Sequence, residues 1–359
     1  MAEALKEIYN RAFLKQLAQV LQNAHSECDP NAFVSSFQPG DWKKLELMQR
    51  VEAISDRLNE FLPPEYITAV QILVNASCEF SRYVYIIFPD FVAMFGLNDY
   101  KTSFRAFEQL TCYSTSEFAI RNCLEKDPDR TMKQMLKWSR HKNEHVRRLA
   151  SEGCRPRLPW ASALNEFKKD PSPILPILEN LKQDKSEYVR RSVANNLNDI
   201  SKDHPNLVID LAKSWAGQHP FTDRLLKHGC RTLLKSGETK VLSLFGYPEP
   251  KHIQIENFKA DSVVKMHDDF EFSFTIQSKK TKPLGQVRIE YELEFVRQGN
   301  KYSRKLFKLA DNYFEESEKG FNKRFSFKPL STRKYFPGKH QLRILVNGKT
   351  LYINNFMLT

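Results

Sequence analysis

The chain has 359 residues, of which 41% are apolar, so it is long enough to bury a sizeable core. This length predicts two domains, or one long solenoid with an appendage. No stretch reaches 18 uncharged apolar residues, and the N-terminus lacks the cationic and apolar regions of a signal peptide. We therefore expect neither a membrane-spanning nor a secreted protein.

The net charge of +12 is unevenly distributed along the chain. Residues 1–100 carry a balance of −5, residues 101–249 a balance of +8 and residues 250–359 a balance of +9. A basic balance confined to the latter two regions indicates a surface that binds a polyanion. A basic protein without any such partner would show the same balance, so charge alone leaves both interpretations open.

The first two thirds of the chain have apolar residues at helical spacing, interrupted by Pro and Gly. Asn143 and Ser186 are expected to cap two of these helices, because an acidic residue follows each of them. The predicted helices are residues 1–22, Trp42–Phe61, Tyr66–Phe88, Ser103–Lys126, Arg130–Ser139, Glu144–Cys154, Ile174–Gln183, Glu187–Ser201, Pro205–Gly217 and Thr222–Ser236.

Two of these helices are copies of one pattern. The residues Glu144, Val146, Arg147 and Arg148 recur 43 positions later as Glu187, Val189, Arg190 and Arg191. A helical repeat of about 40–47 residues is typical of HEAT or armadillo solenoids. The concave face of such a solenoid commonly binds a long partner. A weaker match, between Arg224–Arg231 and Arg148–Arg155, extends the repetition to the region of residue 240.

The remainder of the chain has the period-2 alternation of half-buried strands. The expected strands are His252–Phe258, Ser262–Lys265, Asp269–Gln277, Gln286–Arg297, Tyr302–Leu309, Phe321–Phe327, Lys339–Val346 and Lys349–Leu358. Asn347–Gly348 between two of them is a strong hairpin signal. We therefore predict an α+β multidomain protein, with an N-terminal all-α HEAT-like solenoid (1–245), a linker (246–251) and a C-terminal all-β immunoglobulin-like sandwich (252–359).

The arginine pairs are the first candidates for function. Adjacent residues on a helix project about 100° apart, so one arginine of a pair can reach a ligand while the other packs within the solenoid. Arginines at this position can bind phosphates, or they can cap and bridge neighbouring repeats. Arg155 and Arg157 add to the basic region around the first copy.

Three acidic residues lie close to these arginines. Glu152 aligns with Asn195 of the next copy, so the repeat itself does not require a carboxylate there. Asp199 follows one turn beyond Asn195, and Glu117 belongs to the preceding helical unit. The three acids can converge on the concave face as a catalytic cluster, or they can balance the arginines in ion pairs between repeats.

Trp160 follows a helix that is ended by proline. It can stack on sugars or bases, or it can fill the interface between repeats.

No metal or cofactor site is expected. The six cysteines form no C-x-x-C pair, and His141 and His145 have helical spacing but no third ligand. The chain also lacks a Gly-rich phosphate loop and the usual nucleophile motifs.

The segments Val146–Trp160 and Val189–Ile200 resemble the AlkC family of bacterial DNA glycosylases, which is related to the AlkD glycosylases and shares their HEAT-like fold. The resemblance covers roughly residues 1–245. The C-terminal β-region is similar to the immunoglobulin-like appendage that one AlkC subgroup carries.

The resemblance implies a glycosylase that excises 3-methyladenine and 3-methylcytosine from duplex DNA, as a step of base excision repair, without drawing the lesion into a deep pocket. It also implies that Glu117, Glu152 and Asp199 are the family's acidic cluster and Trp160 its aromatic residue. The expected partner is duplex DNA with alkylated bases, contacted through Trp160, Arg147, Arg148, Arg155, Arg157, Arg190 and Arg191. We expect a monomer in the bacterial cytoplasm, associated with the nucleoid.

The chemistry agrees with this implication. A base methylated at N3 is cationic and leaves readily, so the enzyme must mainly stabilise positive charge on the deoxyribose and position water, which carboxylates can do. The main alternative is a non-catalytic HEAT-repeat scaffold that binds DNA. A carbohydrate or peptide hydrolase with an accessory β-domain is a third interpretation.

Overall fold

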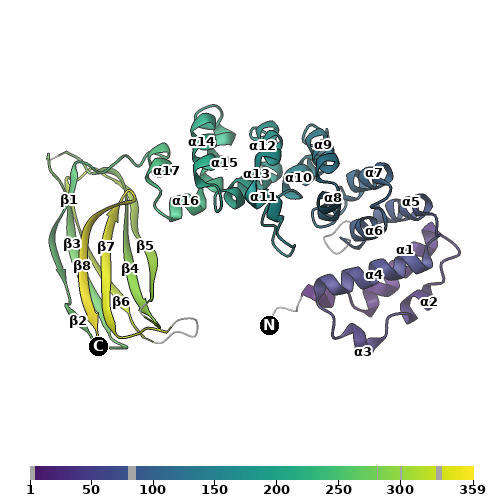
Figure 1. Cartoon of the computed structure of the whole chain (residues 1–359), viewed down its shortest axis with the longest axis horizontal. Coiled ribbons are helices and arrows are strands. Elements are labelled where there is room, and N and C mark those ends of the chain that lie inside the picture. Colours follow the sequence, from purple (N-terminus) through teal and green to yellow (C-terminus); the bar gives the residue numbers. More distant parts are fainter. Residues whose placement is uncertain (1–4, 80–85, 281, 300, 329–333) are drawn as a thin grey trace. The chain divides into compact units, whose positions relative to one another are not determined.

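The computed structural model describes residues 5–79, 86–280, 282–299, 301–328 and 334–359 (Figure 1). The contacts within the chain divide it into two compact units. The first comprises residues 1–203 and 217–229, and the second comprises residues 204–216 and 230–359. The predicted order of a helical region followed by an all-β region is confirmed.

The first unit is entirely helical. Its elements are η1 (Leu5–Ile8), α1 (Arg11–Ala24), α2 (Pro30–Ser35), α3 (Pro39–Trp42), α4 (Leu47–Phe61), α5 (Tyr66–Ser77), α6 (Ile87–Phe95), α7 (Tyr100–Leu110), α8 (Ile120–Lys126), α9 (Pro128–Trp138), α10 (Glu144–Glu152), α11 (Asn165–Lys169), η3 (Ser172–Ile174), α12 (Leu175–Leu181), α13 (Glu187–Ile200) and α15 (Pro220–Gly229).

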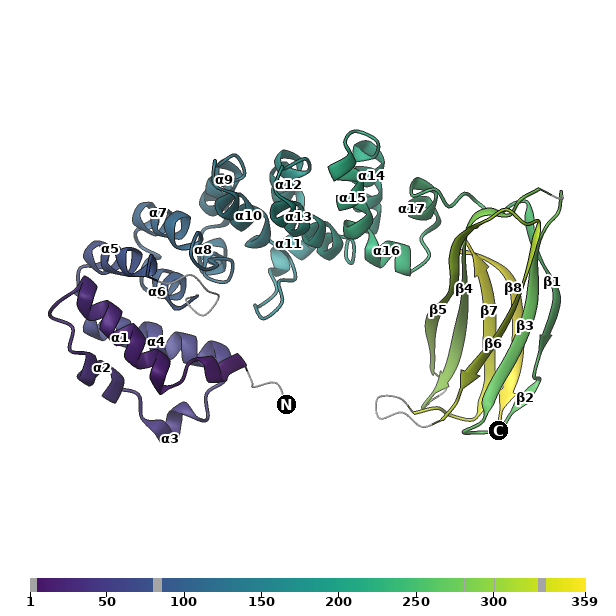
Figure 2. The same ribbon diagram turned by 180° about the vertical axis from the view of Figure 1, so that it is seen from behind.

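The repeated sequence pattern forms α10 and α13, which lie side by side (Figures 1 and 2). Val189, Val193 and Leu197 recur every four residues and are buried, so one face of α13 faces the core. Asn196 on this helix donates a 2.8 Å hydrogen bond to the backbone carbonyl of Ser151 in α10. The apolar stripe and this buried polar bond together fix the two repeats against each other.

The second unit combines the last helices with a β-sandwich. Its elements are α14 (Pro205–Trp215), α16 (Arg231–Lys235), α17 (Thr239–Leu244), β1 (Ile253–Ala260), β2 (Val263–Val264), β3 (Asp269–Ser278), β4 (Gly285–Arg297), β5 (Lys301–Phe314), β6 (Glu318–Ser326), β7 (Gly338–Val346) and β8 (Lys349–Leu358). One sheet has the order β1-β3-β6 and the other β2-β8-β7-β4-β5. All pairs are antiparallel except β2 with β8.

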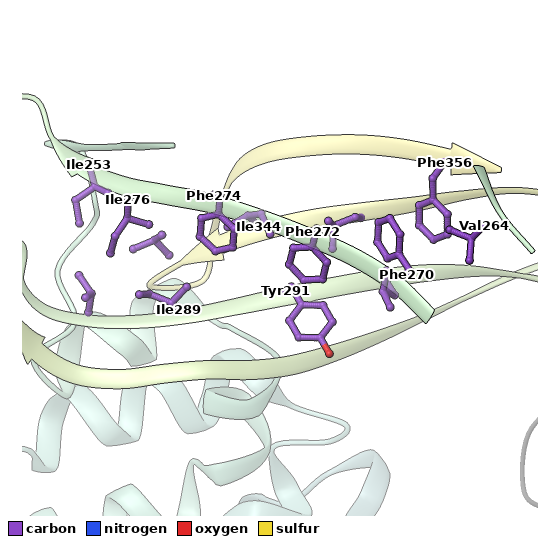
Figure 3. Close-up of a cluster of buried hydrophobic side chains, with 14 of the residues drawn as sticks. Ile253, Val264, Phe270, Phe272, Phe274, Ile276, Ile289, Tyr291, Ile344 and Phe356 are labelled. Atoms are coloured by element: carbon purple, nitrogen blue, oxygen red, sulfur yellow. The ribbon is translucent and has the colours of Figure 1, made fainter. Parts of the chain in front are cut away.

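Aromatic side chains from both sheets form the core of the sandwich (Figure 3). Phe270 of β3 stacks on Phe356 of β8 with ring centroids 4.0 Å apart, and Phe272 meets Tyr291 of β4 edge to face at 5.2 Å. Because alternate residues of β3 point inward, the Phe270–Ile276 alternation of the sequence places every second side chain in this core.

The predicted hairpin at Asn347–Gly348 is confirmed. Asn347 has φ of 48° and Gly348 has φ of 77°, as a two-residue turn between antiparallel strands requires. The Asn347 side chain donates a 2.7 Å hydrogen bond to the carbonyl of Pro248, while the hydroxyl of Tyr247 donates one to Asp311. The segment before β1 is thereby fixed to the sandwich.

Several predicted helix boundaries are wrong. The helix predicted over residues 103–126 is interrupted, because α7 ends at Leu110 and α8 begins at Ile120, so Glu117 lies in a turn. Part of the helix predicted over residues 66–88 lies outside the described residues. Asn143 caps α10 as predicted. Ser186 occupies the predicted N-cap position of α13, but its side chain makes no capping hydrogen bond, and its hydroxyl donates to the Glu144 carboxylate.

Candidate active site

The three predicted acids come from three successive parts of the helical unit. Glu117 lies in the turn before α8, Glu152 is the last residue of α10, and Asp199 is the next-to-last residue of α13. All three side chains are buried. A buried carboxylate requires a charged or hydrogen-bonding partner, so the surroundings of these acids determine what they can do.

Two arginines link the three carboxylates into a continuous chain of charges. Arg155 donates to Glu152 Oε1 at 2.6 Å and to Asp199 Oδ2 at 2.8 Å. Arg148 donates to Glu117 Oε2, and its Nη2 lies 3.7 Å from Glu152 Oε1. The structure therefore brings the acids together, and it brings Arg148 and Arg155 into the same cluster.

The carboxylates differ in how many of their oxygens are engaged. Among the described residues, Arg148 and Thr115 donate hydrogen bonds to Oε2 of Glu117, and Arg155 donates one to Oε1 of Glu152. Glu117 Oε1 and Glu152 Oε2 accept no hydrogen bond from that part of the chain. Asp199 has both oxygens engaged, because Lys202 reaches Oδ1 at 3.2 Å. Two fixed carboxylates thus each keep one oxygen available for a ligand.

The cluster holds its arginines firmly in the cationic state. Burial alone would lower the pKa of the Arg148 guanidinium, but the carboxylates of Glu117 and Glu152 outweigh this effect and raise the pKa. Burial also acts to lower the pKa of Arg155, and Glu152 and Asp199 reverse it in the same way. Because both guanidinium groups stay charged, they orient the carboxylates beside them.

The first arginine of each repeated pair serves the repeat itself. Arg147 donates to the carbonyls of His141 and Lys142 at 2.9 Å, and it forms a bidentate pair with Asp184. Arg190 makes the equivalent bonds 43 positions later, to the carbonyls of Asp184 and Lys185. These contacts agree with the interpretation of these arginines as caps between repeats.

The second arginine of each pair differs between the two copies. Arg148 is drawn into the acid cluster, whereas Arg191 pairs with Glu187 at 3.2 Å and its side chain is 66% exposed. Arg157 lies beyond the cluster and forms a bidentate pair with Asp203 at 2.7 and 3.2 Å. Arg191 and Arg157 are accordingly the more accessible of the predicted DNA-binding arginines.

Trp160 lies at the surface of the segment that follows α10. Its side chain is 64% exposed, so the interpretation that it fills the interface between repeats is wrong. Its φ of 65° lies in the left-handed region, which large residues rarely adopt. A strained and exposed aromatic residue of this kind is often found at a functional surface.

Tyr188 is a member of the site that the sequence analysis missed. The Arg148 guanidinium lies 4.8 Å from the centroid of its ring, and the edge of the ring meets His145. The sequence signal that could have indicated Tyr188 is its position directly after Glu187, at the start of the repeated helix. Tyr188 therefore supports the arginine that joins Glu117 to Glu152.

In the described residues, no group of three His, Cys, Asp or Glu side chains is arranged to hold a metal ion. None of the helices in that same part of the chain has the length and apolar character needed to span a bilayer.

Comparison with known proteins decides the family. Residues 97–224 match the family model described as DNA alkylation repair enzyme, and residues 254–359 match the one described as the C-terminal Ig-like domain of the uncharacterised protein YhaZ. The solved structure of Pseudomonas fluorescens alkylpurine DNA glycosylase AlkC, bound to DNA containing an abasic site analog, is 34% identical with a TM-score of 0.86. That similarity covers 100% of this chain and 99% of the other.

The chain belongs to the AlkC family of DNA glycosylases. The uncharacterized protein YhaZ of Bacillus subtilis (strain 168) is 44% identical over 347 residues, which is 96% of each chain. The resemblance stated from sequence is thereby confirmed, together with the immunoglobulin-like nature of the β-domain and the assignment of the protein as a DNA glycosylase.

Proposed function

We propose that this AlkC-family enzyme hydrolyses the N-glycosidic bond of cationic N3-alkylated bases, 3-methyladenine and 3-methylcytosine, in duplex DNA, and that the lesion stays outside any deep pocket. The observation that carries the proposal is the buried acid cluster, in which Glu117 and Glu152 each have one oxygen that accepts no hydrogen bond from the described residues. The similar AlkC structure, which is bound to DNA with an abasic site analog, supports DNA as the partner.

The chemistry follows from the charge of the substrate. An N3-alkylated base carries a positive charge and departs as a neutral base, so the difficult part of the reaction is the cationic sugar that remains. Carboxylates held in place before the reaction stabilise this cation without having to reorganise. The spare oxygen of Glu152 can approach the sugar and accept a hydrogen bond from the attacking water, with Glu117 and Asp199 completing the cluster.

The arginines of the cluster have a different task from the exposed ones. Arg148 holds one oxygen of Glu117, and Arg155 holds one oxygen of Glu152 and one of Asp199, so we propose that the two arginines orient the carboxylates. The more accessible Arg157 and Arg191 are the better candidates for phosphate contacts, while Arg147 and Arg190 act within the repeats. Exposed Trp160 is proposed to stack against the DNA beside the lesion.

We further propose that the lesion is excised without base flipping. This mechanism needs the enzyme to reach only the deoxyribose, and carboxylates at helix ends can do so from outside the stack. Duplexes with 2-aminopurine next to the lesion test this point, because unstacking raises the fluorescence of this base. A bright complex would indicate flipping, and an unchanged signal supports the proposal.

The organisation of the protein is proposed as a glycosylase domain (1–245), a linker (246–251) and a β-sandwich (252–359). The two matched family models fall on either side of this linker. We propose that the protein acts as a monomer in the bacterial cytoplasm, on the nucleoid, where its DNA substrate is found. Light scattering of the free protein and of its DNA complex tests the monomeric state.

The decisive experiment measures the release of free 3-methyladenine and 3-methylcytosine from alkylated duplex DNA. Wild-type protein should release both bases, and Asp199→Asn should slow the release about a hundredfold or more. Glu166→Gln is a control for the loss of a negative charge outside the cluster, because Glu166 is an exposed acid that pairs with Lys169. If the wild type binds the DNA but releases no base, the protein is the non-catalytic scaffold that the sequence left as the alternative.

A further inference from the structure

Arg121 is a buried arginine that lies behind the acid cluster. It is the second residue of α8 and only 2% exposed. Its guanidinium donates to the backbone carbonyls of Gly153 at 3.2 Å, of Arg155 at 2.9 Å and of Ser162. One side chain therefore binds the segment 153–162 at both of its ends.

This segment connects the acid cluster to the exposed tryptophan. It begins where α10 ends at Glu152, it contains Arg155 and Arg157, and it presents Trp160. It has no regular secondary structure, and among its internal backbone bonds the one from Ala161 to Leu158 is long, at 3.3 Å. A segment of this kind depends on side chains for its shape, because few backbone bonds hold it.

The hydrogen bond from Arg121 to the carbonyl of Arg155 connects Arg121 to the acid cluster. Arg121 holds the backbone carbonyl of Arg155, while the side chain of Arg155 bridges Glu152 and Asp199. A shift of this backbone would move the guanidinium that aims both carboxylates. Misplacement of a catalytic group by 1 Å can cost about a hundredfold in rate, so a backbone anchor at this point matters for catalysis.

We propose that Arg121 is a positioning residue, which fixes the segment 153–162 so that Arg155 and Trp160 are set for the reaction. This inference rests on the proposed function for its kinetic consequence, although the anchoring itself does not. Within the described residues, the Arg121 guanidinium donates hydrogen bonds to backbone carbonyls and to no carboxylate. It acts through the three carbonyls that it binds.

A second buried arginine provides a matched control. Arg50 in α4 is also 2% exposed, binds the carbonyl of Lys6 at 2.7 Å and, like Arg121, leaves its Nε without a hydrogen-bond partner. It lies far away in the sequence, and its contacts in the described part of the chain are with Lys6, Glu7 and the ring of Trp42, outside the acid cluster. Substitutions of Arg50 report what the loss of a buried arginine does by itself.

The first measurement is amide hydrogen exchange of the folded full-length protein. Arg121→Lys and Arg121→Gln should increase exchange in residues 153–162 at least about tenfold, because local opening becomes easier, while the same changes at Arg50 should leave this segment unchanged. Acrylamide quenching of the Trp160 fluorescence, obtained by comparison with Trp160→Phe, should change only in the Arg121 variants. These readouts do not require the protein to be a glycosylase.

The second measurement is single-turnover excision of 3-methyladenine. Arg121→Lys should lower the rate about a hundredfold with little change in the concentration of enzyme that gives half-maximal rate, and Arg50→Lys should keep the wild-type rate. Unchanged exchange in residues 153–162 of Arg121→Lys, or equal effects of the Arg121 and Arg50 variants, would overturn the proposal. A wild-type enzyme without activity would refute the proposed function alone.

Discussion

Replacement of Glu152 by glutamine separates the proposed catalytic role of this acid from its structural role. Glutamine has the same shape, and its amide oxygen can still accept the hydrogen bond from Arg155. Neither arginine loses its only partner, because Arg148 keeps Glu117 and Arg155 keeps Asp199. We therefore expect Glu152→Gln to lower the free energy of unfolding by about 1 kcal/mol, equivalent to a decrease in Tm of about 2–4 °C.

The effect on the reaction should be much larger. Glu152 Oε1 is held by Arg155 at 2.6 Å, and the opposite oxygen remains for the sugar and the water. Removing one preorganised group that stabilises charge in a transition state costs about 3–4 kcal/mol, so the rate should fall about 10²–10³-fold. Single-turnover release of 3-methyladenine, followed by chromatography of the free base, measures this rate directly.

Arg155→Gln is the comparison that makes the result interpretable. This change leaves the buried carboxylates of Glu152 and Asp199 without their shared cation, and breaking such a pair costs about 3–5 kcal/mol of stability. Calorimetry should therefore give Arg155→Gln a clearly lower Tm than Glu152→Gln. The reasoning is refuted if Glu152→Gln keeps its rate within about threefold of the wild type, or if it loses as much stability as Arg155→Gln.

Three further outcomes are expected. Trp160→Ala should weaken binding to abasic-site DNA about tenfold at unchanged Tm, because the side chain is exposed and stacking contributes about 1–3 kcal/mol. Arg147→Gln should cost about 3–5 kcal/mol of stability, because it leaves Asp184 unpaired. Arg191→Gln should leave Tm unchanged, and salt titrations should show that the logarithm of its DNA-binding constant depends less steeply on the logarithm of salt concentration, with a slope smaller by about 1. Burial raises the pKa of Asp90 from 3.8 to about 6, so ionisation of this acid destabilises the fold increasingly as pH rises from 4 to 6. In urea unfolding, the free energy of unfolding of Asp90→Asn should therefore exceed that of the wild type by up to about 3 kcal/mol at pH 8, and the two should be equal below pH 4.

Much of the architecture could be predicted from sequence, because it depends on local periodicity. The repeated helices α10 and α13, the strands of the sandwich and the Asn347–Gly348 turn all follow from side-chain spacing and turn chemistry. The boundaries failed where long-range contacts compete with local ones. The helix predicted over residues 103–126 is the clearest case, because it is interrupted between Leu110 and Ile120, where Glu117 meets Arg148 of the next helical unit.

The composition of the acid cluster could be predicted, but its connections could not. Ion pairs between the acids and the arginines were one of the interpretations that the sequence left open, and Arg148 and Arg155 were also expected to contact DNA. Nothing local in the sequence shows which acids these two arginines meet, because Glu117 and Asp199 lie 31 and 44 positions away from them. Such contacts depend on where each helix ends and how its neighbours stack. The same reason hides Arg121, whose partners are backbone carbonyls that carry no sequence signal.

The repeat explains how a scaffold position can become part of an active site. In both copies the first arginine of the pair binds the carbonyls of the preceding turn, so the solenoid needs this residue. The second arginine is not needed for that purpose, so its contacts depend on which acidic side chains lie near it. Where Glu117 and Glu152 are present, Arg148 joins and orients them; where position 195 is asparagine, Arg191 stays in solvent with Glu187. In the proposed function, the position that the repeat leaves free supplies the arginine that orients the acids, while Arg147 and Arg190 stabilise the solenoid.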